Sequence, residues 1–215
     1  ATPPGFRPLH FKYAIDNDKH VFMEKPVATD AHGVRKVLET AKDANRKKLN
    51  VVVGLQRRYQ YSYLNILKQV RRGVIGKITS GQVRWNGAGV WVRARKPNQT
   101  EMEYQMRNWY YFNWLCGDHI VEQHIHNIDV ANWFLNEYPI SAQGMGGREV
   151  RKGIDHGEIF DHHFVEFKYA SGATISSQCR HQPGTHKQVN ELIVGTKGKV
   201  NICLLYTSPS PRDGL

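Results

Sequence analysis

The stretch Cys116-Gly-Asp-His-Ile-Val-Glu-Gln-His-Ile-His-Asn-Ile-Asp-Val-Ala-Asn-Trp-Phe134 carries two interleaved patterns of helical period. An apolar series predicts the side that faces a core, and its members are Val121, Ile125, Ile128 and Leu135. A polar series stacks on a neighbouring face and consists of Glu122, His126 and Asp129. Asp118 precedes both and is the expected N-cap. A helix with this polar face is either half-exposed to solvent there or lines a site.

The first 57 residues alternate short apolar strands with amphipathic helices, which is typical of a parallel α/β sheet. We expect a helix over 6–17, a strand over 20–24, a helix from Thr29 or Asp30 to about Lys47, and a strand over 50–54. The second helix is predicted to face the core with Val34, Val37, Leu38 and Ala41.

After residue 58 the pattern changes to strands joined by hairpin turns. A helix capped by Ser62 and ended by Gly73 leads into strands near 78–85, 140–144, 160–169, 173–178, 190–194 and 199–202. Residues 86–115 read as irregular and rich in aromatic side chains. Hairpin signals at 169–172 and 195–198 predict an antiparallel sheet. The expected fold class is therefore α/β followed by an α+β domain, with the boundary between residues 57 and 58.

The last stretch, residues 203–215, departs from all of this. It leaves the strand pattern abruptly and holds two prolines within three residues, Pro209 and Pro211. It resembles the translated read-through of a sequencing adapter, so we exclude it from the fold as a non-native tail. A natural tail of this composition would be disordered.

Composition narrows the classes of function. The chain has 215 residues and a formal net charge of +11, which raises the prospect of an anionic partner. The basic residues stand in short scattered clusters without a nucleic-acid motif, so nucleic acid is not an expected partner, although a non-catalytic basic binding module stays an alternative. No apolar run approaches the roughly 20 residues of a membrane span, so no membrane partner is expected.

Cysteine and histidine give a second alternative. The three cysteines form no Cys-x-x-Cys pair, so the spacing favours neither a disulfide framework nor a structural zinc site. The chain nevertheless has 11 histidines. His119, Glu122 and His126 share one predicted helical face, and Asp161-His162-His163 could supply further ligands to a metal enzyme.

Glu24-Lys25-Pro26 stands at the carboxyl end of a predicted parallel strand, which is where open α/β sheets bind ligands. A lysine there can hydrogen-bond a substrate hydroxyl, and burial can lower its pKa toward acid–base use. The alternative is a solvated surface lysine. Ala1-Thr-Pro-Pro4 and Gly54-Leu-Gln-Arg-Arg58 lie at strand ends on the same predicted edge, so the three segments form one rim.

An ordered set of motifs then gives the chain a resemblance. The set is Ala1-Thr-Pro-Pro with His10, Lys19-His-Val-Phe-Met-Glu-Lys-Pro26, Val53-Gly54 with Arg57, Gly73-Val-Ile-Gly-Lys-Ile78, Glu122-x-x-x-His126-x-x-Asp129 and Gly195-Thr-Lys-Gly198. It resembles the glucose–fructose oxidoreductase / inositol dehydrogenase / MocA family and covers residues 1 to about 202.

The resemblance implies a fold and an activity. Residues 1–57 would be the C-terminal half of an NAD(P)-binding Rossmann domain. Residues 58–202 would form a C-terminal α/β domain for substrate binding and oligomerisation, with an open, mainly antiparallel sheet. The implied activity is hydride transfer between NAD or NADP and a sugar, inositol or related polyol, in a homodimer or homotetramer. Some relatives instead use NAD to cleave glycosidic bonds, which is the alternative within the family.

The resemblance also implies roles for single residues. Lys25 would contact the nicotinamide ribose and the substrate hydroxyl, and His126 would be the acid–base. Asp129 would hold or orient that site, and Glu122 stands where the family usually has an aspartate. The residues implied to lie along the cofactor are Thr2, Pro3, Glu24, Lys25 and Arg57. The aromatic residues of 109–114 would either stack on a sugar ring or belong to the core.

One family feature has no counterpart in the sequence. The glycine-rich Gly-x-Gly-x-x-Gly loop and the acidic residue that reads the ribose belong to a first βαβ unit, and the chain starts at what resembles the end of the fourth strand. We therefore expect the 215-residue chain to bind the dinucleotide poorly and to be inactive as it stands, so that the implied activity describes a longer parent protein. Its compartment is left open, with the cytoplasm as default and export to the periplasm as the alternative.

Overall fold

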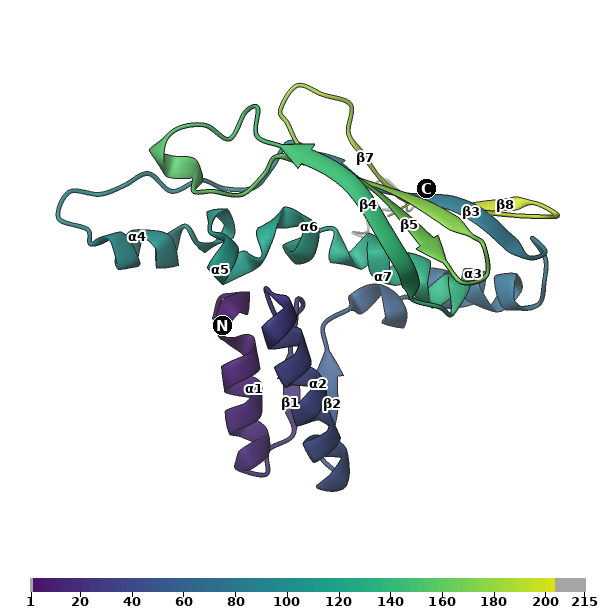
Figure 1. Cartoon of the computed structure of the whole chain (residues 1–215), viewed down its shortest axis with the longest axis horizontal. Helices are drawn as coiled ribbons and strands as arrows, with labels where there is room; N and C mark the ends of the chain where they lie inside the picture. The colour runs from purple at the N-terminus through teal and green to yellow at the C-terminus, as the bar shows by residue number, and fades with distance from the viewer. Residues whose placement is uncertain (1, 204–215) are drawn as a thin grey trace, which may run out of the picture.

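The computed structural model describes residues 2–203, which fold into an upright part and a broad layer above it (Figure 1). The upright part contains the 3₁₀ turn η1 (Pro4–Phe6), α1 (Arg7–Asp16), β1 (Val21–Met23), α2 (Ala31–Arg46) and β2 (Val51–Val53). Strands β1 and β2 pair in parallel, with Val21 opposite Val51. The expected alternation of strands and helices in this part is confirmed.

Helix α2 begins as expected but buries a different stripe. Asp30 is its N-cap, and its Oδ1 accepts the backbone N–H of Gly33 at 2.6 Å. The prediction that Val34 and Leu38 face the core is wrong, because both are exposed. The stripe that packs inward is Gly33, Val37, Thr40 and Ala44. A small residue at 33 allows close contact with Pro8 of α1, and this contact sets the rotation of the helix.

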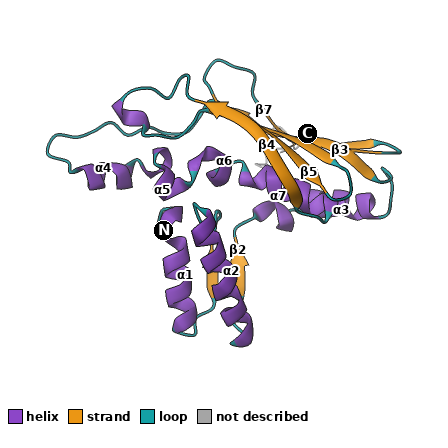
Figure 2. Ribbon diagram, in the orientation of Figure 1, coloured by secondary structure: helices purple, strands orange, loops and turns teal. Residues whose placement is uncertain are grey.

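The layer contains one six-stranded sheet in the order β4-β5-β6-β3-β7-β8 (Figure 2). The strands are β3 (Ile78–Gly87), β4 (Pro139–Gly147), β5 (His162–Tyr169), β6 (Thr174–His181), β7 (Gln188–Gly195) and β8 (Lys199–Cys203). Neighbours β3 and β6 run parallel, and the other pairs are antiparallel. The predicted open, mainly antiparallel sheet is therefore confirmed.

Helices lie on one side of this layer, and α7 packs directly on the sheet (Figure 1). They are α3 (Tyr61–Arg71), α4 (Glu101–Arg107), α5 (Asn113–Cys116), α6 (Asp118–Glu122) and α7 (Ile125–Leu135), with 3₁₀ turns η2 (Gln56–Tyr59), η3 (Trp109–Tyr111) and η4 (Ile154–His156). The expected Ser62 cap is wrong, because α3 begins at Tyr61 and Gln60 is its N-cap. Residues 101–116 are also helical where irregular chain was expected. Their signal is the capping box of Thr100 and Glu103.

The predicted single helix after Cys116 is two helices. Helix α6 ends at Glu122 and α7 begins at Ile125, and the two residues between them keep right-handed helical backbone angles while the regular hydrogen bonding is interrupted. Asp118 is not an N-cap; its backbone φ is +67°, and its carboxylate accepts the backbone N–H groups of His119 and Phe160. Correspondingly, the predicted apolar series is only half-buried, and the polar residues Glu122 and His126 are buried instead.

The layer has its core between α3, α7 and the sheet. The core side chains there are Tyr63, Leu67, Val70, Ile75, Val130, Phe134, Ile193 and Ile202. A second cluster collects the aromatic residues before α6: Tyr104, Tyr110, Tyr111 and Phe112 are buried with Leu115 and Ile159. Of the two alternatives for residues 109–114, the core therefore accounts for Tyr110, Tyr111 and Phe112, whereas Trp114 is exposed.

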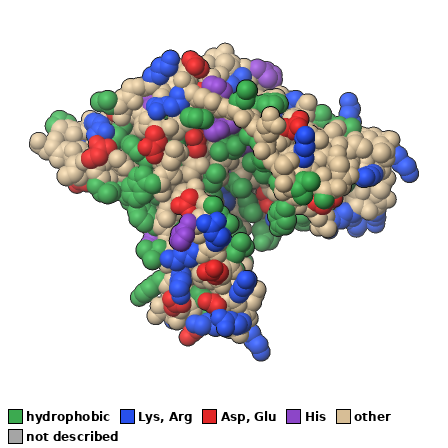
Figure 3. All heavy atoms as spheres, viewed as in Figure 1, with side chains coloured by type: hydrophobic (Ala, Val, Ile, Leu, Met, Phe, Trp, Pro, Cys, Tyr) green, Lys and Arg blue, Asp and Glu red, His purple; other side chains and the backbone are tan. Residues whose placement is uncertain are grey.

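The described residues include no helix long and apolar enough to span a membrane. Residues 204–215 of the expected non-native tail lie outside the described residues, and the division at residues 57 and 58 stays a prediction. Lys and Arg side chains are spread over both parts on the face drawn in Figure 3, without forming a band.

Candidate active site

The end of β1 meets helix α6 where the two parts of the molecule join. Lys25 Nζ donates to Glu122 Oε1 at 2.7 Å and also to the backbone carbonyl of Glu122. Both side chains are only about a tenth exposed, at 13% and 10%. Two residues 97 positions apart in sequence are thus held as one charged pair.

His126 stands in the first turn of α7 beside this pair. Its ring is stacked on that of Trp85 from β3, with centroids 6.1 Å apart. Its Nδ1 is buried and has no hydrogen-bond partner among the described residues. Burial lowers the pKa of His126 to about 3, and the positive charges of Lys25 and Arg57 act in the same direction. The imidazole is therefore neutral at pH 7 and able to accept a proton.

This low pKa predicts a pH-dependent stability. Between the ordinary pKa of 6.5 and about 3, the unfolded chain binds a proton at His126 that the folded chain does not. Stability therefore falls as the pH falls through this window. His126→Asn should remove the effect. The unfolding free energy of the parent minus that of the variant should therefore decrease by up to about 1.4 kcal/mol for each unit by which the pH falls. Urea unfolding at pH 5 and 7 tests this, and a difference independent of pH would contradict it.

Asp129 lies one turn after His126 but faces another partner. Its two carboxylate oxygens accept from Arg58 Nε at 2.8 Å and Nη2 at 2.7 Å, a bidentate geometry. Arg58 also lies 5.2 Å above the ring of Trp133. The Asp129 carboxylate is thus paired with Arg58, and it forms no hydrogen bond with Lys25 or His126. Sequence reasoning did not single out Arg58, although it lies in the same strand-end segment as Arg57.

Arg57, expected along the cofactor, lies inside the protein. Its side chain is 2% exposed and forms an ion pair with Glu191 of β7. Glu191 also accepts from Tyr63 Oη at 3.0 Å and Asn127 Nδ2 at 2.5 Å. A guanidinium enclosed in this way has no surface to offer a dinucleotide. We therefore correct this expectation and leave Arg57 out of the cofactor contacts.

Thr2 and Glu24 line one pocket beside β1, with a volume of about 290 Å³. Thr2 Oγ1 lies 3.4 Å from His10 Nδ1, and both residues belong to the lining. The Glu24 carboxylate lies against Gly54, where a Cβ atom would collide with it. Pro3 is the residue before η1. The predicted rim at the strand ends therefore brings Thr2 and Glu24 together, with Lys25 on the neighbouring side facing α6.

The metal site suggested by one helical face is not assembled. Glu122 pairs with Lys25, and the group of side chains close enough to share an ion contains neither Glu122 nor His126. Asp161 accepts the backbone N–H groups of residues 149–151 and closes that loop. Within residues 2–203, the side chains close enough to share an ion are instead His119, His163 and Cys179.

Comparisons with known proteins cover both parts of the chain. The sequence profile of an oxidoreductase family with an NAD-binding Rossmann fold matches residues 1–54. The profile of the GFO/IDH/MocA C-terminal domain matches residues 63–201.

Three relatives illustrate the similarity. The inositol 2-dehydrogenase of Rhizobium meliloti (strain 1021) is 27% identical over 85% of this chain and 49% of its own length. The 2,7-anhydro-N-acetylneuraminate hydratase of Escherichia coli (strain K12) is 27% identical over 100% of this chain and 53% of its own. The crystal structure of GenD2 from gentamicin A biosynthesis, in complex with NAD, shares the fold with a TM-score of 0.76 at 17% identity, covering 98% of this chain and 55% of that one.

The chain spans about half the length of the curated relatives that it matches. The profile of the C-terminal domain alone covers more than half of the chain, and the two profiles match consecutive segments in the order of the two structural parts. The chain therefore belongs to the GFO/IDH/MocA family of oxidoreductases.

Proposed function

We propose that the protein to which this chain belongs transfers a hydride between NAD or NADP and a hydroxyl-bearing carbon of a sugar, inositol or related polyol. The observation that carries this is the charged pair of Lys25 and Glu122 beside a neutral, buried His126 with an unpaired ring nitrogen. Buried polar atoms are normally paired, and unpaired ones concentrate at functional sites. A substrate hydroxyl would supply the missing partner.

Each side chain of the site has a separate role in the proposed reaction. A nicotinamide dinucleotide supplies the hydride acceptor when it is bound. His126 accepts the proton of the substrate hydroxyl on its unpaired ring nitrogen Nδ1. Lys25 stabilises the negative charge that develops on the substrate oxygen. Glu122 holds the amine of Lys25 in place, and Trp85 holds the plane of the imidazole.

The described residues at the end of β1 are suited to contact the nicotinamide half of a dinucleotide. Thr2, Glu24 and Lys25 lie at or beside the carboxyl end of β1, the edge where parallel sheets bind nucleotides. The sequence holds no Gly-x-Gly-x-x-Gly segment to bind the pyrophosphate. We therefore propose that Thr2 and Glu24 contact the cofactor on the nicotinamide side, and that the phosphates need a further βαβ unit.

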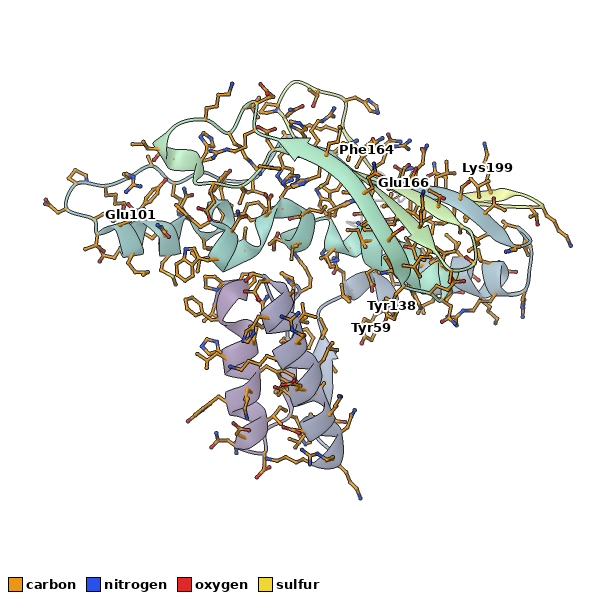
Figure 4. All side chains as sticks on the ribbon, in the orientation of Figure 1. Tyr59, Glu101, Tyr138, Phe164, Glu166 and Lys199 are labelled. Carbon is orange, nitrogen blue, oxygen red and sulfur yellow. The ribbon has the colours of Figure 1, made fainter. Side chains whose placement is uncertain are left out.

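Self-association is proposed for the uncovered face of the sheet. Met145 on β4 and Phe164 on β5 are directly opposite each other and are exposed, at 84% and 48%; Phe164 is labelled in Figure 4. Exposed apolar side chains paired across two strands fit a second copy of the chain, giving a homodimer or homotetramer. A protein that stays monomeric in sedimentation velocity at micromolar concentration would rule this out.

The test of the proposal is calorimetry of nucleotide binding on two proteins. One is the 215-residue chain, and the other, the extended chain, is the same sequence preceded by the whole N-terminal segment of the Rhizobium meliloti inositol 2-dehydrogenase up to the position that corresponds to Ala1. We expect the extended chain to bind NAD⁺ or NADP⁺ and the 215-residue chain to bind weakly, because only the extended chain has the phosphate loop.

Activity of the extended chain on inositols and sugars then separates the reaction types. Net formation of NADH or NADPH supports a dehydrogenase, and release of a sugar without net reduction supports the NAD-dependent glycoside hydrolase. A folded extended chain that binds neither dinucleotide would contradict the proposal in both forms.

A further inference from the structure

A cluster of nitrogen and sulfur atoms lies between α6 and the sheet and shares no side chain with the Lys25–Glu122 pair. One ring nitrogen of His119, one of His163 and the thiol sulfur of Cys179 lie within 4.8 Å of one another. His119 is 0% exposed and Cys179 is 1% exposed. His163 and Cys179 are opposite each other on strands β5 and β6, and His119 comes from α6, which covers that face. Three elements thus converge on one buried point.

Two of the ring nitrogens there lack a partner. His119 Nε2 and His163 Nε2 are both buried without a hydrogen bond in the described part of the chain. Buried polar atoms are normally paired, so two unpaired ring nitrogens in one place favour a shared partner such as a bound ion. His163 Nε2 lies 3.4 Å from Asp118 Oδ1, which is an ion-pair distance without the alignment of a hydrogen bond.

The opposite edge of His119 is arranged as in a metal ligand. Its Nδ1 lies 3.0 Å from Asp118 Oδ1 and 3.1 Å from the carbonyl oxygen of Phe160. An Nδ1–H donated to these acceptors leaves Nε2 as the free lone pair. Histidines that bind metals commonly donate their other N–H to a carboxylate or carbonyl in this manner, which fixes the tautomer and the ring orientation.

One positive charge stands near the cluster. Arg151 Nη1 is 3.5 Å from His119 Nδ1, on the edge of the ring away from Nε2, and donates to the Phe160 carbonyl oxygen at 2.7 Å. Its Nη2 is engaged with His181 Nδ1 at 2.6 Å. The Asp118 carboxylate, next to both histidines, offsets this charge, and a bound thiolate would add a second negative charge beside the ion.

We propose that His119, His163 and Cys179 form a binding site for Zn²⁺. Two imidazoles and a thiolate are ligands that this ion prefers, and three protein ligands leave one tetrahedral position for water or Asp118. Binding releases the thiol proton of Cys179 to solvent. The ion would link α6 to β5 and β6. Its ligand on α6, His119, is three residues before Glu122 in the sequence. The site is independent of the proposed dehydrogenase chemistry, which uses none of these three side chains.

The experiment uses the 215-residue chain, stripped with EDTA, exchanged into chelator-free buffer and then given Zn²⁺. After gel filtration, elemental analysis should find about one zinc per chain, and the melting temperature should rise by roughly 5 °C or more. Cys179→Ala and His163→Gln should each lose the bound zinc. Cys116→Ala is the matched control, because it removes another buried thiol outside the cluster and should keep the zinc.

Two outcomes would overturn the proposal. One is a folded parent chain that retains no zinc, and the other is equal zinc binding by the parent, Cys179→Ala and His163→Gln. A cobalt measurement keeps the proposal testable even if the variants do not fold, because Co²⁺ can be loaded into the unmutated parent chain. Co²⁺ bound by Cys179 should give a thiolate-to-metal absorption band, and a cobalt-loaded parent without that band contradicts the assigned ligand.

Discussion

Replacing His126 with asparagine in the extended chain should lower turnover by about 10²–10⁴-fold, the usual contribution of a general acid–base. The loss should appear in kcat, because the removed imidazole acts in the proton-transfer step rather than in binding alone. Asparagine keeps a polar side chain of similar size. Dinucleotide binding, measured by the same calorimetry, should therefore change little. Steady-state kinetics on a polyol that the parent oxidises gives the comparison.

His32→Asn is the matched control for this variant. His32 is exposed on α2 and takes no part in the Lys25–Glu122 pair, so its replacement should leave kcat unchanged. If His126→Asn retains the parent's kcat while His32→Asn behaves as expected, the assignment of His126 as the acid–base is wrong. Equal losses in both would point to a general effect of histidine replacement rather than to chemistry.

Replacing Arg57 with leucine should destabilise the fold by about 3–5 kcal/mol, as expected when one partner of a buried ion pair is removed. Glu191 would stay buried at 0% exposure with only Tyr63 and Asn127 to stabilise its charge. The Arg57 guanidinium also lies 5.6 Å from the ring of Trp85, so its loss also removes packing beside His126. Urea unfolding of the 215-residue chain measures the change.

Arg58→Leu offers a control from the adjacent position. Arg58 also forms an ion pair, with Asp129, but its side chain is 38% exposed. Exposed pairs contribute little because water and salt screen them, so the expected loss is about 1 kcal/mol or less. Equal destabilisation by the two variants would contradict the distinction between the buried and the exposed pair. Arg57→Leu combined with Glu191→Leu should recover much of the stability, since no unpaired buried charge remains.

Local signals in the sequence were sufficient for most of the elements. Strands β1 and β2, the Asp30 cap of α2 and the hairpins of the sheet follow from periodicity, capping residues and turn residues, which act over a few neighbouring positions. Local signals failed where packing overrode them. The rotation of α2, for example, was set by its contact with α1. Helix α4 is a different case, because its Thr100–Glu103 capping box is a local signal that was present in the sequence and was missed.

The polar residues show the limit most clearly. The sequence identified Lys25, Glu122 and His126 as chemistry-bearing, because they stand at a strand end and at a helix start. It could not place Arg57, whose partner Glu191 is 134 positions away, nor gather His119 with His163 and Cys179. It also predicted one continuous helix where the chain breaks between Glu122 and Ile125.

The sequence by itself determined the order and type of most elements, the motifs of the family and the identity of the candidate acid–base. Tertiary structure alone decided which charges are paired, which are buried and which side chains share a point in space. The physical reason is that periodicity and capping depend on neighbours along the chain. Burial and pairing depend on surfaces from distant segments, such as β1 against α6, whose meeting no local pattern encodes.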